Sequence, residues 1–266
     1  MISSASARRL DIVELAHTSG LTSVDELSAR FEVTASTIRR DLAILTADGK
    51  IARTYGGAMA IGAQAGESSF RQRNLEHSEA KAAMAHYART LIADGETVLL
   101  DAGSSVAALA REIRSGISLT VATTSIAVVE ELAESDQLHV ECLGGTLRQA
   151  SSGFVGPLTE AALERMTFDS VFLGADGVTT RGSGEICEAD LQQTRLKELM
   201  CRQAAAVYVL ADATKLGREL FHARASLPAG WMLVTDATAG DDVVAEFAGV
   251  GVDVRVVGAD GTLVTR

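Results

Sequence analysis

Apolar residues recur at helical spacing near the start of the chain. Ile38, Leu42 and Leu45 stand four and three residues apart, so they share one face of a helix predicted to begin after Thr34. Two shorter segments before it also have helical apolar spacing, and the segment 50–57 ends in paired glycines. The pattern predicts three short helices followed by a hairpin.

The opposite face of the third predicted helix is polar. Ser36, Arg39 and Arg40 point away from the apolar face, and a helix that presents hydroxyls and guanidiniums fits the major groove of DNA. Three helices and a basic hairpin predict a winged helix-turn-helix over residues 1–58 that binds a double-stranded DNA operator. A small bundle with solvated arginines explains the paired arginines alone, but not the capping residue Thr34, the helical spacing and the hairpin together. The candidate DNA contacts are Thr34, Ser36, Thr37, Arg39, Arg40, Lys50, Arg53 and Tyr55.

Beyond residue 76 the pattern changes to apolar runs that alternate with helical stretches. Continuous apolar runs that end in Gly, Asp or Thr are typical of strands buried on both faces. Their alternation with helices predicts an α/β domain with a doubly wound, mostly parallel sheet over residues 76–266. Residues 59–75 lack sustained periodicity and are interpreted as a linker. The runs are 97–103, 119–125, 138–145, 170–177, 206–212, 231–236 and 252–258.

Polar residues collect where these runs end, and ligands of parallel sheets bind at the carboxyl ends of strands. Gly103, Ser104 and Ser105 open a helix after the first run, which predicts a phosphate cradle. Asp176 and Lys215 follow later runs and offer a carboxylate and an ammonium at the same edge. A turn role for Asp176 and a solvated loop position for Lys215 stay open as alternatives.

The charge distribution is compatible with DNA binding, although the chain has a net charge of −11. Residues 1–60 hold seven basic and seven acidic residues, so the acidic excess lies wholly in the remainder. A segment such as residues 1–60, which has no net charge but carries basic residues on one surface, can bind a polyanion. We expect strong salt dependence.

The cysteines and the apolar runs bear on the compartment. Cys142, Cys187 and Cys201 are far apart and match no metal pattern, so we expect buried free thiols in a reducing cytosol and neither metal nor cofactor. The N-terminal residues lack an apolar leader, and no run reaches the length of a membrane span. The expected location is the cytoplasm.

Three short segments carry a specific pattern: G-L-T-S-V at 20–24, T-I-R-R-D-L at 37–42 and Y-G-G-A at 55–58. They resemble the DeoR-type family of bacterial transcriptional regulators over about the first fifth of the chain. The family usually carries a histidine before the paired glycines, where this chain has Tyr55. Since a tyrosine can still contact a phosphate or sugar, the change concerns one contact and not the module.

Four further segments are similar to the effector domain of the same family and to ribose-5-phosphate isomerase: D-A-G-S-S at 101–105, A-T-T-S at 122–125, L-G-A-D-G-V at 173–178 and D-A-T-K-L-G at 212–217. The resemblance implies a pocket for a phosphorylated sugar. Glu188 is its weakest member, because an acidic residue also suits the start of a helix. The implied effector residues are Asp101, Gly103, Ser104, Ser105, Thr123, Thr124, Gly144, Gly145, Asp176, Glu188 and Lys215.

An aldose–ketose isomerase with an appended DNA-binding head is the alternative function. Isomerisation needs groups that move protons between adjacent carbons and between hydroxyls. The isomerase pattern has a second carboxylate where this chain has Thr179, and residues 180–190 replace its Lys- and Gly-rich loop. The sequence therefore favours a repressor, not an enzyme, that a phosphorylated sugar releases from DNA. An activator stays open, and paired half-sites indicate a homo-oligomer.

Overall fold

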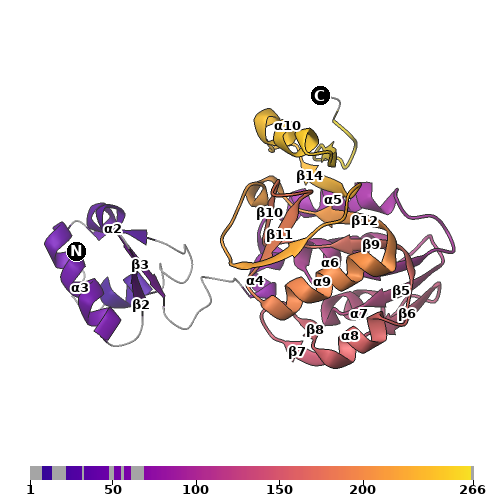
Figure 1. Cartoon of the computed structure of the whole chain (residues 1–266), viewed down its shortest axis with the longest axis horizontal. Coiled ribbons are helices and arrows are strands. Elements are labelled where there is room, and N and C mark those ends of the chain that lie inside the picture. Colours follow the sequence, from indigo (N-terminus) through magenta and orange to yellow (C-terminus); the bar gives the residue numbers. More distant parts are fainter. Residues whose placement is uncertain are drawn as a thin grey trace. The chain divides into compact units, whose positions relative to one another are not determined.

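The computed structural model describes residues 8–13, 22–31, 33–47, 51–54, 57–60 and 69–264 of the chain. Figure 1 shows the elements that these residues form. The chain divides into two compact units, Met1–Ser68 and Ser69–Arg266.

The first unit has the helices and hairpin that the apolar pattern predicts. A helical segment at 8–13 and helices α2 (Val24–Phe31) and α3 (Ala35–Ala47) accompany an antiparallel sheet in the order β1-β3-β2. Its strands are β1 (Thr22–Ser23), β2 (Ile51–Thr54) and β3 (Gly57–Ala60). Ile38, Leu42 and Leu45 of α3 are at most 2% exposed and pack with Ile12 and Leu27. Burial of each such side chain stabilises the fold by about 1.5–3 kcal/mol.

The second unit is built on a seven-stranded sheet in the order β15-β14-β12-β9-β4-β5-β6. All neighbouring strands are parallel. Each of the seven predicted apolar runs supplies one of these strands, which confirms the predicted α/β class. The strands are β4 (Thr97–Leu100), β5 (Leu119–Thr123), β6 (Leu138–Cys142), β9 (Phe168–Leu173), β12 (Ala204–Leu210), β14 (Met232–Asp236) and β15 (Asp253–Val257).

Both faces of the sheet are covered by helices. Along β4, Val98 and Leu100 pack into one apolar core and Leu99 packs into the other, because successive strand residues point to opposite faces. Helices α5 (Ser78–Arg89), α6 (Ser104–Ile113) and α7 (Ile126–Leu132) contribute to the first core. Helices α8 (Pro157–Leu163), α9 (Leu191–Gln203) and α10 (Asp241–Gly249) contribute to the second.

Smaller strands and a short helix lie outside the seven-stranded sheet. Strands β7 (Thr146–Arg148) and β8 (Gly153–Val155) pair with each other, and β10 (Gly177–Thr179), β11 (Glu185–Glu188) and β13 (Ala223–Ser226) form a three-stranded antiparallel sheet. A 3-10 turn, η1 (Ala213–Lys215), follows β12.

The order of the strands fixes where a ligand can enter. From β4 the chain adds β5 and β6 on one side, and then returns to place β9 and the later strands on the other. The topological switch point therefore lies between β4 and β9, and the carboxyl ends of these strands frame a crevice.

Two details differ from the sequence-based expectations. Residues 70–75, interpreted as linker, form helix α4 (Phe70–Leu75) of the second unit, because the Ser69 hydroxyl accepts a hydrogen bond from the Gln72 N–H and caps the helix. Residues 61–68 lie outside the described residues. Cys187 and Cys201 are buried as expected, but Cys142 is exposed, since it ends the edge strand β6.

Candidate functional site

Helix α3 separates an apolar face from a polar one, as its sequence predicts. Ser36, Arg39 and Arg40 are exposed on the side opposite the core, and Thr37 is half-buried. The exposed Thr34 stands before the helix, and its hydroxyl accepts a hydrogen bond from the Thr37 N–H at 3.3 Å. The polar surface at the start of the helix thus consists of Thr34, Ser36, Thr37, Arg39 and Arg40.

The hairpin supplies the remaining candidate DNA contacts. Arg53 lies on β2, where its backbone pairs with Ala58 of β3. Lys50, Tyr55 and the side chain of Arg53 lie outside the described part of the chain. Their contacts with DNA stay predictions.

One arginine of the first unit is buried. Arg8 is 7% exposed, and its Nε donates to Asp41 Oδ2 at 2.8 Å. Arg9 Nε lies 3.8 Å from the other oxygen of Asp41. The ion pair ties the first helical segment to α3, so Arg8 stabilises the head and adds little to its basic surface.

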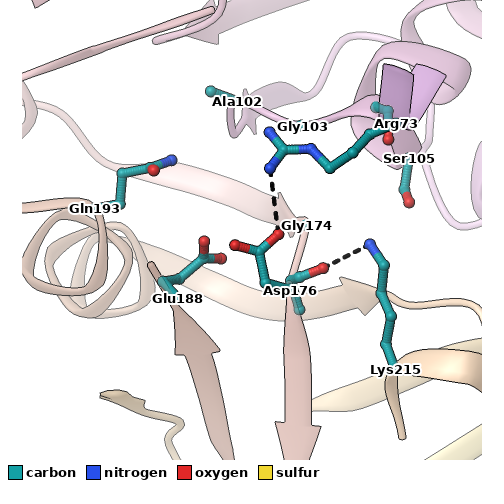
Figure 2. A pocket seen from close by; sticks show the side chains of 11 residues that line it. Arg73, Ala102, Gly103, Ser105, Gly174, Asp176, Glu188, Gln193 and Lys215 are labelled. Atoms are coloured by element: carbon teal, nitrogen blue, oxygen red, sulfur yellow. Dashed lines mark hydrogen bonds and ion pairs between the residues drawn. The ribbon is translucent and has the colours of Figure 1, made fainter. Parts of the chain in front are cut away.

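The crevice between β4 and β9 holds a small cavity of about 20 Å³. Six of the eleven residues implied by the resemblance line it, and they come from the start of α6, from β11, from η1 and from the loop after β9. Figure 2 shows the Arg73 guanidinium directed at the Asp176 carboxylate, and the Lys215 ammonium directed at the backbone beside it. The lining residues are Arg73, Ala102, Gly103, Ser104, Ser105, Gly174, Ala175, Asp176, Glu188, Gln193 and Lys215.

One wall of the cavity is the N-terminus of α6. The first N–H groups of a helix lack partners within it and, together with the helix dipole, attract anions. The Ser105 hydroxyl is buried and finds no hydrogen-bond partner among the described residues. At Gly103 a Cβ atom would meet only the Gly174 Cα, at the ordinary contact distance of 3.8 Å, so the α6 N-terminus lies directly against the end of β9.

The facing wall carries charged groups. Arg73 Nη1 lies 3.4 Å from Asp176 Oδ1, and both side chains are 13% exposed. Asp176 Oδ2 is buried and has no partner within the described structure. The Lys215 ammonium donates to the Ala175 carbonyl at 2.6 Å. The cavity therefore presents two cations and one unsatisfied carboxylate oxygen to a ligand.

Beneath the cavity floor, Lys197 of α9 joins three groups. It contacts Asp101 and Glu188, the latter at 3.1 Å, and donates to the Gly174 carbonyl at 2.8 Å. The Gly174 N–H in turn donates to Asp101 at 3.1 Å. This buried triad fixes the ends of β4, β9 and β11 relative to one another, and so sets the geometry of the cavity.

The triad has an unequal distribution of protons. Burial raises the pKa of Glu188 to about 8, against the opposing effect of Lys197. Burial disfavours the charged form of Lys197, but the Asp101 and Glu188 carboxyls outweigh it and hold its pKa above the usual value. At neutral pH Glu188 is therefore mostly protonated, and Lys197 keeps its positive charge.

Five of the residues implied by the resemblance do not line the cavity. Asp101 lies in the triad. The Thr123 hydroxyl donates to the Leu100 carbonyl at 2.7 Å, and Thr124 is buried. Gly144 and Gly145 pack on α8: the Gly144 carbonyl accepts from Thr159 at 3.0 Å, and a Cβ at Gly145 would meet that hydroxyl at 2.2 Å. These residues shape the loops around the site instead.

Three residues at or beneath the site were missed from the sequence: Arg73, Gln193 and Lys197. Arg73 was assigned to the linker, and its neighbours lack the periodicity that would reveal a packed helix. Lys197 is 1% exposed, yet a lysine inside a helical segment is ordinarily solvated. Its burial is explained by its partners Asp101, Glu188 and the Gly174 carbonyl, and the local sequence around Lys197 does not show that these groups meet.

A second hollow of about 290 Å³ lies at the ends of β12, β14 and β15. Its described lining includes Asp212 and Asp236 but no lysine or arginine. Asp236 accepts hydrogen bonds from the Ala213 N–H at 2.7 Å and the Thr238 N–H at 3.0 Å, so it caps the neighbouring turns. Because carboxylates predominate in this lining, with Lys215 lying 3.9 Å from Asp212, the hollow disfavours an anionic ligand.

None of the helices in the described ranges combines the length and apolarity needed to cross a bilayer.

Comparison with known proteins assigns both units. The DeoR-like helix-turn-helix domain matches residues 8–64, and the DeoR C terminal sensor domain matches residues 76–237. The HTH-type transcriptional regulator GlpR of Haloferax volcanii is 35% identical over 247 residues, which cover 93% of this chain and 96% of that protein. The putative aga operon transcriptional repressor of Escherichia coli O157:H7 is 29% identical, with 97% and 96% covered. The lactose phosphotransferase system repressor of Streptococcus mutans is 30% identical, with 87% and 92% covered.

Solved structures give weaker matches. Ribose 5-phosphate isomerase A of Methanocaldococcus jannaschii aligns with a TM-score of 0.39 and 18% identity, over 53% of this chain and 55% of that one. The enzyme of Neisseria gonorrhoeae aligns with a TM-score of 0.38 and 18% identity, over 51% and 52%. Alignments at this level support no inference about the chemistry of the pocket.

Proposed function

The chain belongs to the DeoR family of helix-turn-helix transcriptional regulators, and we propose that it represses a sugar-metabolism operon until a phosphorylated sugar enters the pocket between β4 and β9. Its first unit binds DNA, and its second unit is the sensor for a small-molecule effector. A relative that covers most of the chain is named a repressor of the lactose phosphotransferase system, which supports a sugar as the signal. We place its action in the cytoplasm, as a homo-oligomer that reads paired half-sites.

The observation that carries the phosphate assignment is the N-terminus of α6 with its unsatisfied Ser105 hydroxyl. Backbone N–H groups and a helix dipole stabilise a bound phosphate. Arg73 and Lys215 line the same cavity and add positive charge. The free oxygen of Asp176 is an acceptor for a sugar hydroxyl. One wall thus suits the phosphate and the facing wall suits the sugar.

Family membership makes the chain a regulator, not an enzyme, and the isomerase alternative is not favoured. The pocket chemistry agrees. Thr179, which stands where the isomerase pattern has a carboxylate, is buried on β10 and cannot act as a base. The raised pKa of Glu188 keeps it mostly protonated at neutral pH. The groups that would move protons are thus depleted while the groups that bind are retained.

The test measures operator binding of the full chain by fluorescence anisotropy on the DNA upstream of its own gene. Pentose and hexose phosphates, their free sugars and inorganic phosphate are added in turn. One phosphorylated sugar should weaken operator binding by about 5–150-fold, the usual range of allosteric coupling. Release by the free sugar at equal concentration would contradict the phosphate assignment, and turnover in a parallel isomerase assay would favour the enzyme.

Variants of the sugar-binding wall test the position of the pocket. Asp176→Ala and Lys215→Ala should bind the operator normally but lose the response to the sugar phosphate, because an effector acts only through contacts that differ between two states. Asp169→Ala is the matched control, since this carboxylate lies exposed on β9 and accepts the Thr97 N–H at 2.8 Å, outside the cavity. A normal response in both pocket variants would show that the effector binds elsewhere.

A further inference from the structure

The pocket is too full for the ligand that the proposed function requires. Its cavity of about 20 Å³ holds roughly one water molecule, whereas small-molecule sites commonly measure about 300–1,000 Å³. A sugar phosphate therefore cannot enter until one of the lining side chains moves away.

Arg73 combines a place on an element without buried residues with a side chain that crosses the cavity, so it is well placed to move. Glu188 and Gln193 are each 5% exposed and belong to β11 and α9, which pack into the fold. Arg73 belongs to α4, a helix in which no residue is buried. Its guanidinium crosses the cavity to Asp176 at 3.4 Å and to the Ala150 carbonyl at 3.1 Å. The first distance is longer than the 2.7–2.9 Å of a strong ionic hydrogen bond, so an incoming anion can compete for the arginine.

Polar contacts hold α4 on the rest of the unit. The buried Lys81 of α5 donates to the carbonyls of Arg73 and Glu76, the latter at 2.7 Å. Arg111 of α6 donates to the Asn74 side chain at 2.8 Å. Contacts of this kind can exchange partners without opening an apolar core. Helix α4 can thus shift by a small distance while α5 and α6 stay in place.

A shift of α4 affects the connection between the two units, because α4 is the first element of the sensor. Residue 70, where α4 begins, directly follows the boundary at Ser68 and Ser69 between the two units. The connection between the two units enters the sensor at α4. Any displacement of α4 therefore moves the place where this connection is attached.

We propose, building on the proposed function, that the Arg73 side chain fills the effector pocket when no ligand is bound. The same residue couples ligand binding in the pocket to the DNA-binding unit. Without effector, its guanidinium fills the space and pairs with Asp176. A phosphorylated sugar displaces it: the phosphate on the α6 N-terminus attracts the guanidinium, and the sugar hydroxyls take over Asp176. Helix α4 follows Arg73, and the altered start of the sensor weakens operator binding.

The experiment compares the full-length wild type with Arg73→Ala and with a matched control, Arg71→Ala, which removes an exposed arginine from the same helix. Ligands are inorganic phosphate and the pentose and hexose phosphates of the operator assay. Calorimetry measures binding, anisotropy measures operator release, and hydrogen exchange followed by mass spectrometry measures the amides of α4.

The wild type and Arg71→Ala should show the same release, with changed exchange in α4 when ligand is bound. Arg73→Ala should bind the operator normally and keep ligand affinity within about a hundredfold, the worth of one charge-assisted contact. At saturating ligand its operator affinity and its α4 exchange should stay unchanged.

The outcomes separate this proposal from the proposed function. If no sugar phosphate binds or releases the wild type, the proposed function fails. If the wild type is released and Arg73→Ala is released equally, the proposed function stands and the coupling role is overturned. Complete loss of ligand binding in Arg73→Ala also overturns it, because Arg73 would then contribute only affinity.

Discussion

Replacing Lys197 by methionine tests the buried triad directly. Methionine has a similar length but no charge, so Lys197→Met leaves the Asp101 carboxylate, 3% exposed, with the Gly174 N–H as a remaining donor. It also removes the donor to the Gly174 carbonyl. Breaking a buried ion pair from one side typically costs about 3–5 kcal/mol. That is a large part of the 5–15 kcal/mol by which a domain is usually stable.

The loss of stability in Lys197→Met has an upper limit, and this limit depends on pH. A stranded carboxylate can escape by binding a proton, which costs an ordinary aspartate about 4 kcal/mol at pH 7 and about 1.5 kcal/mol at pH 5. The destabilisation by Lys197→Met should therefore shrink by about 2–3 kcal/mol between pH 7 and pH 5. Glu188 adds little to it, because its raised pKa already keeps it mostly protonated.

Trp231 makes the measurement specific for the sensor unit. It is the single tryptophan of the chain, is 1% exposed, and packs edge-on against Phe247. Urea unfolding followed by its fluorescence gives the free energy of unfolding at each pH. Asp101→Asn combined with Lys197→Met removes both charges and should recover most of the loss. An equal loss at both pH values, or a double variant as unstable as the single one, would show that an unpaired Asp101 carboxylate is not the cause of the destabilisation.

Three further predictions concern the DNA-binding unit and the protonation of Glu188. Arg39→Ala and Arg40→Ala should each weaken operator binding by about 1–3 kcal/mol in a gel shift and leave the thermal unfolding of the protein unchanged; unaltered affinity in both would reject the groove assignment. Asp41→Ala should abolish operator binding by leaving a buried arginine unpaired, while sugar-phosphate binding by calorimetry stays normal, and any loss of the latter would contradict the independence of the two units. Between about pH 4.5 and 8 the unfolded chain releases the proton of Glu188 and the folded chain retains it, so wild-type stability should fall with rising pH relative to Glu188→Gln. A constant difference across that window in urea unfolding would argue against the raised pKa.

The framework of the sensor was accessible from the sequence because burial on both faces leaves a local signature. A strand such as Thr97–Leu100 must be apolar at successive positions, and this pattern needs no knowledge of its neighbours. The same holds for α3, where one buried stripe specifies both the helix and its exposed surface. The order of the strands was not accessible, because pairing between β4 and β9 joins residues about 70 positions apart.

The contents of the pocket were harder to predict for a related reason. Hydroxyl- and glycine-rich turns do follow the strands, but local sequence does not distinguish Ser105, whose hydroxyl is unsatisfied, from Thr123, whose hydroxyl bonds to Leu100. Arg73 and Lys197 carry no local signal at all. Their roles depend on Asp176 and Asp101, which lie far from them in the sequence and near them in space.

The spread of the pocket residues along the chain, from Arg73 to Lys215, affects the protein while it is being made. Domains generally fold as they emerge from the ribosome, N-terminal domain first, at about 5–20 residues per second. The DNA-binding unit ends at Ser68, about 150 residues before Lys215 is added. For an interval on the order of ten seconds, a nascent chain would thus carry a folded head before its sensor can bind any ligand. Newly made molecules would gain responsiveness only after Lys215 and the other pocket residues have been added.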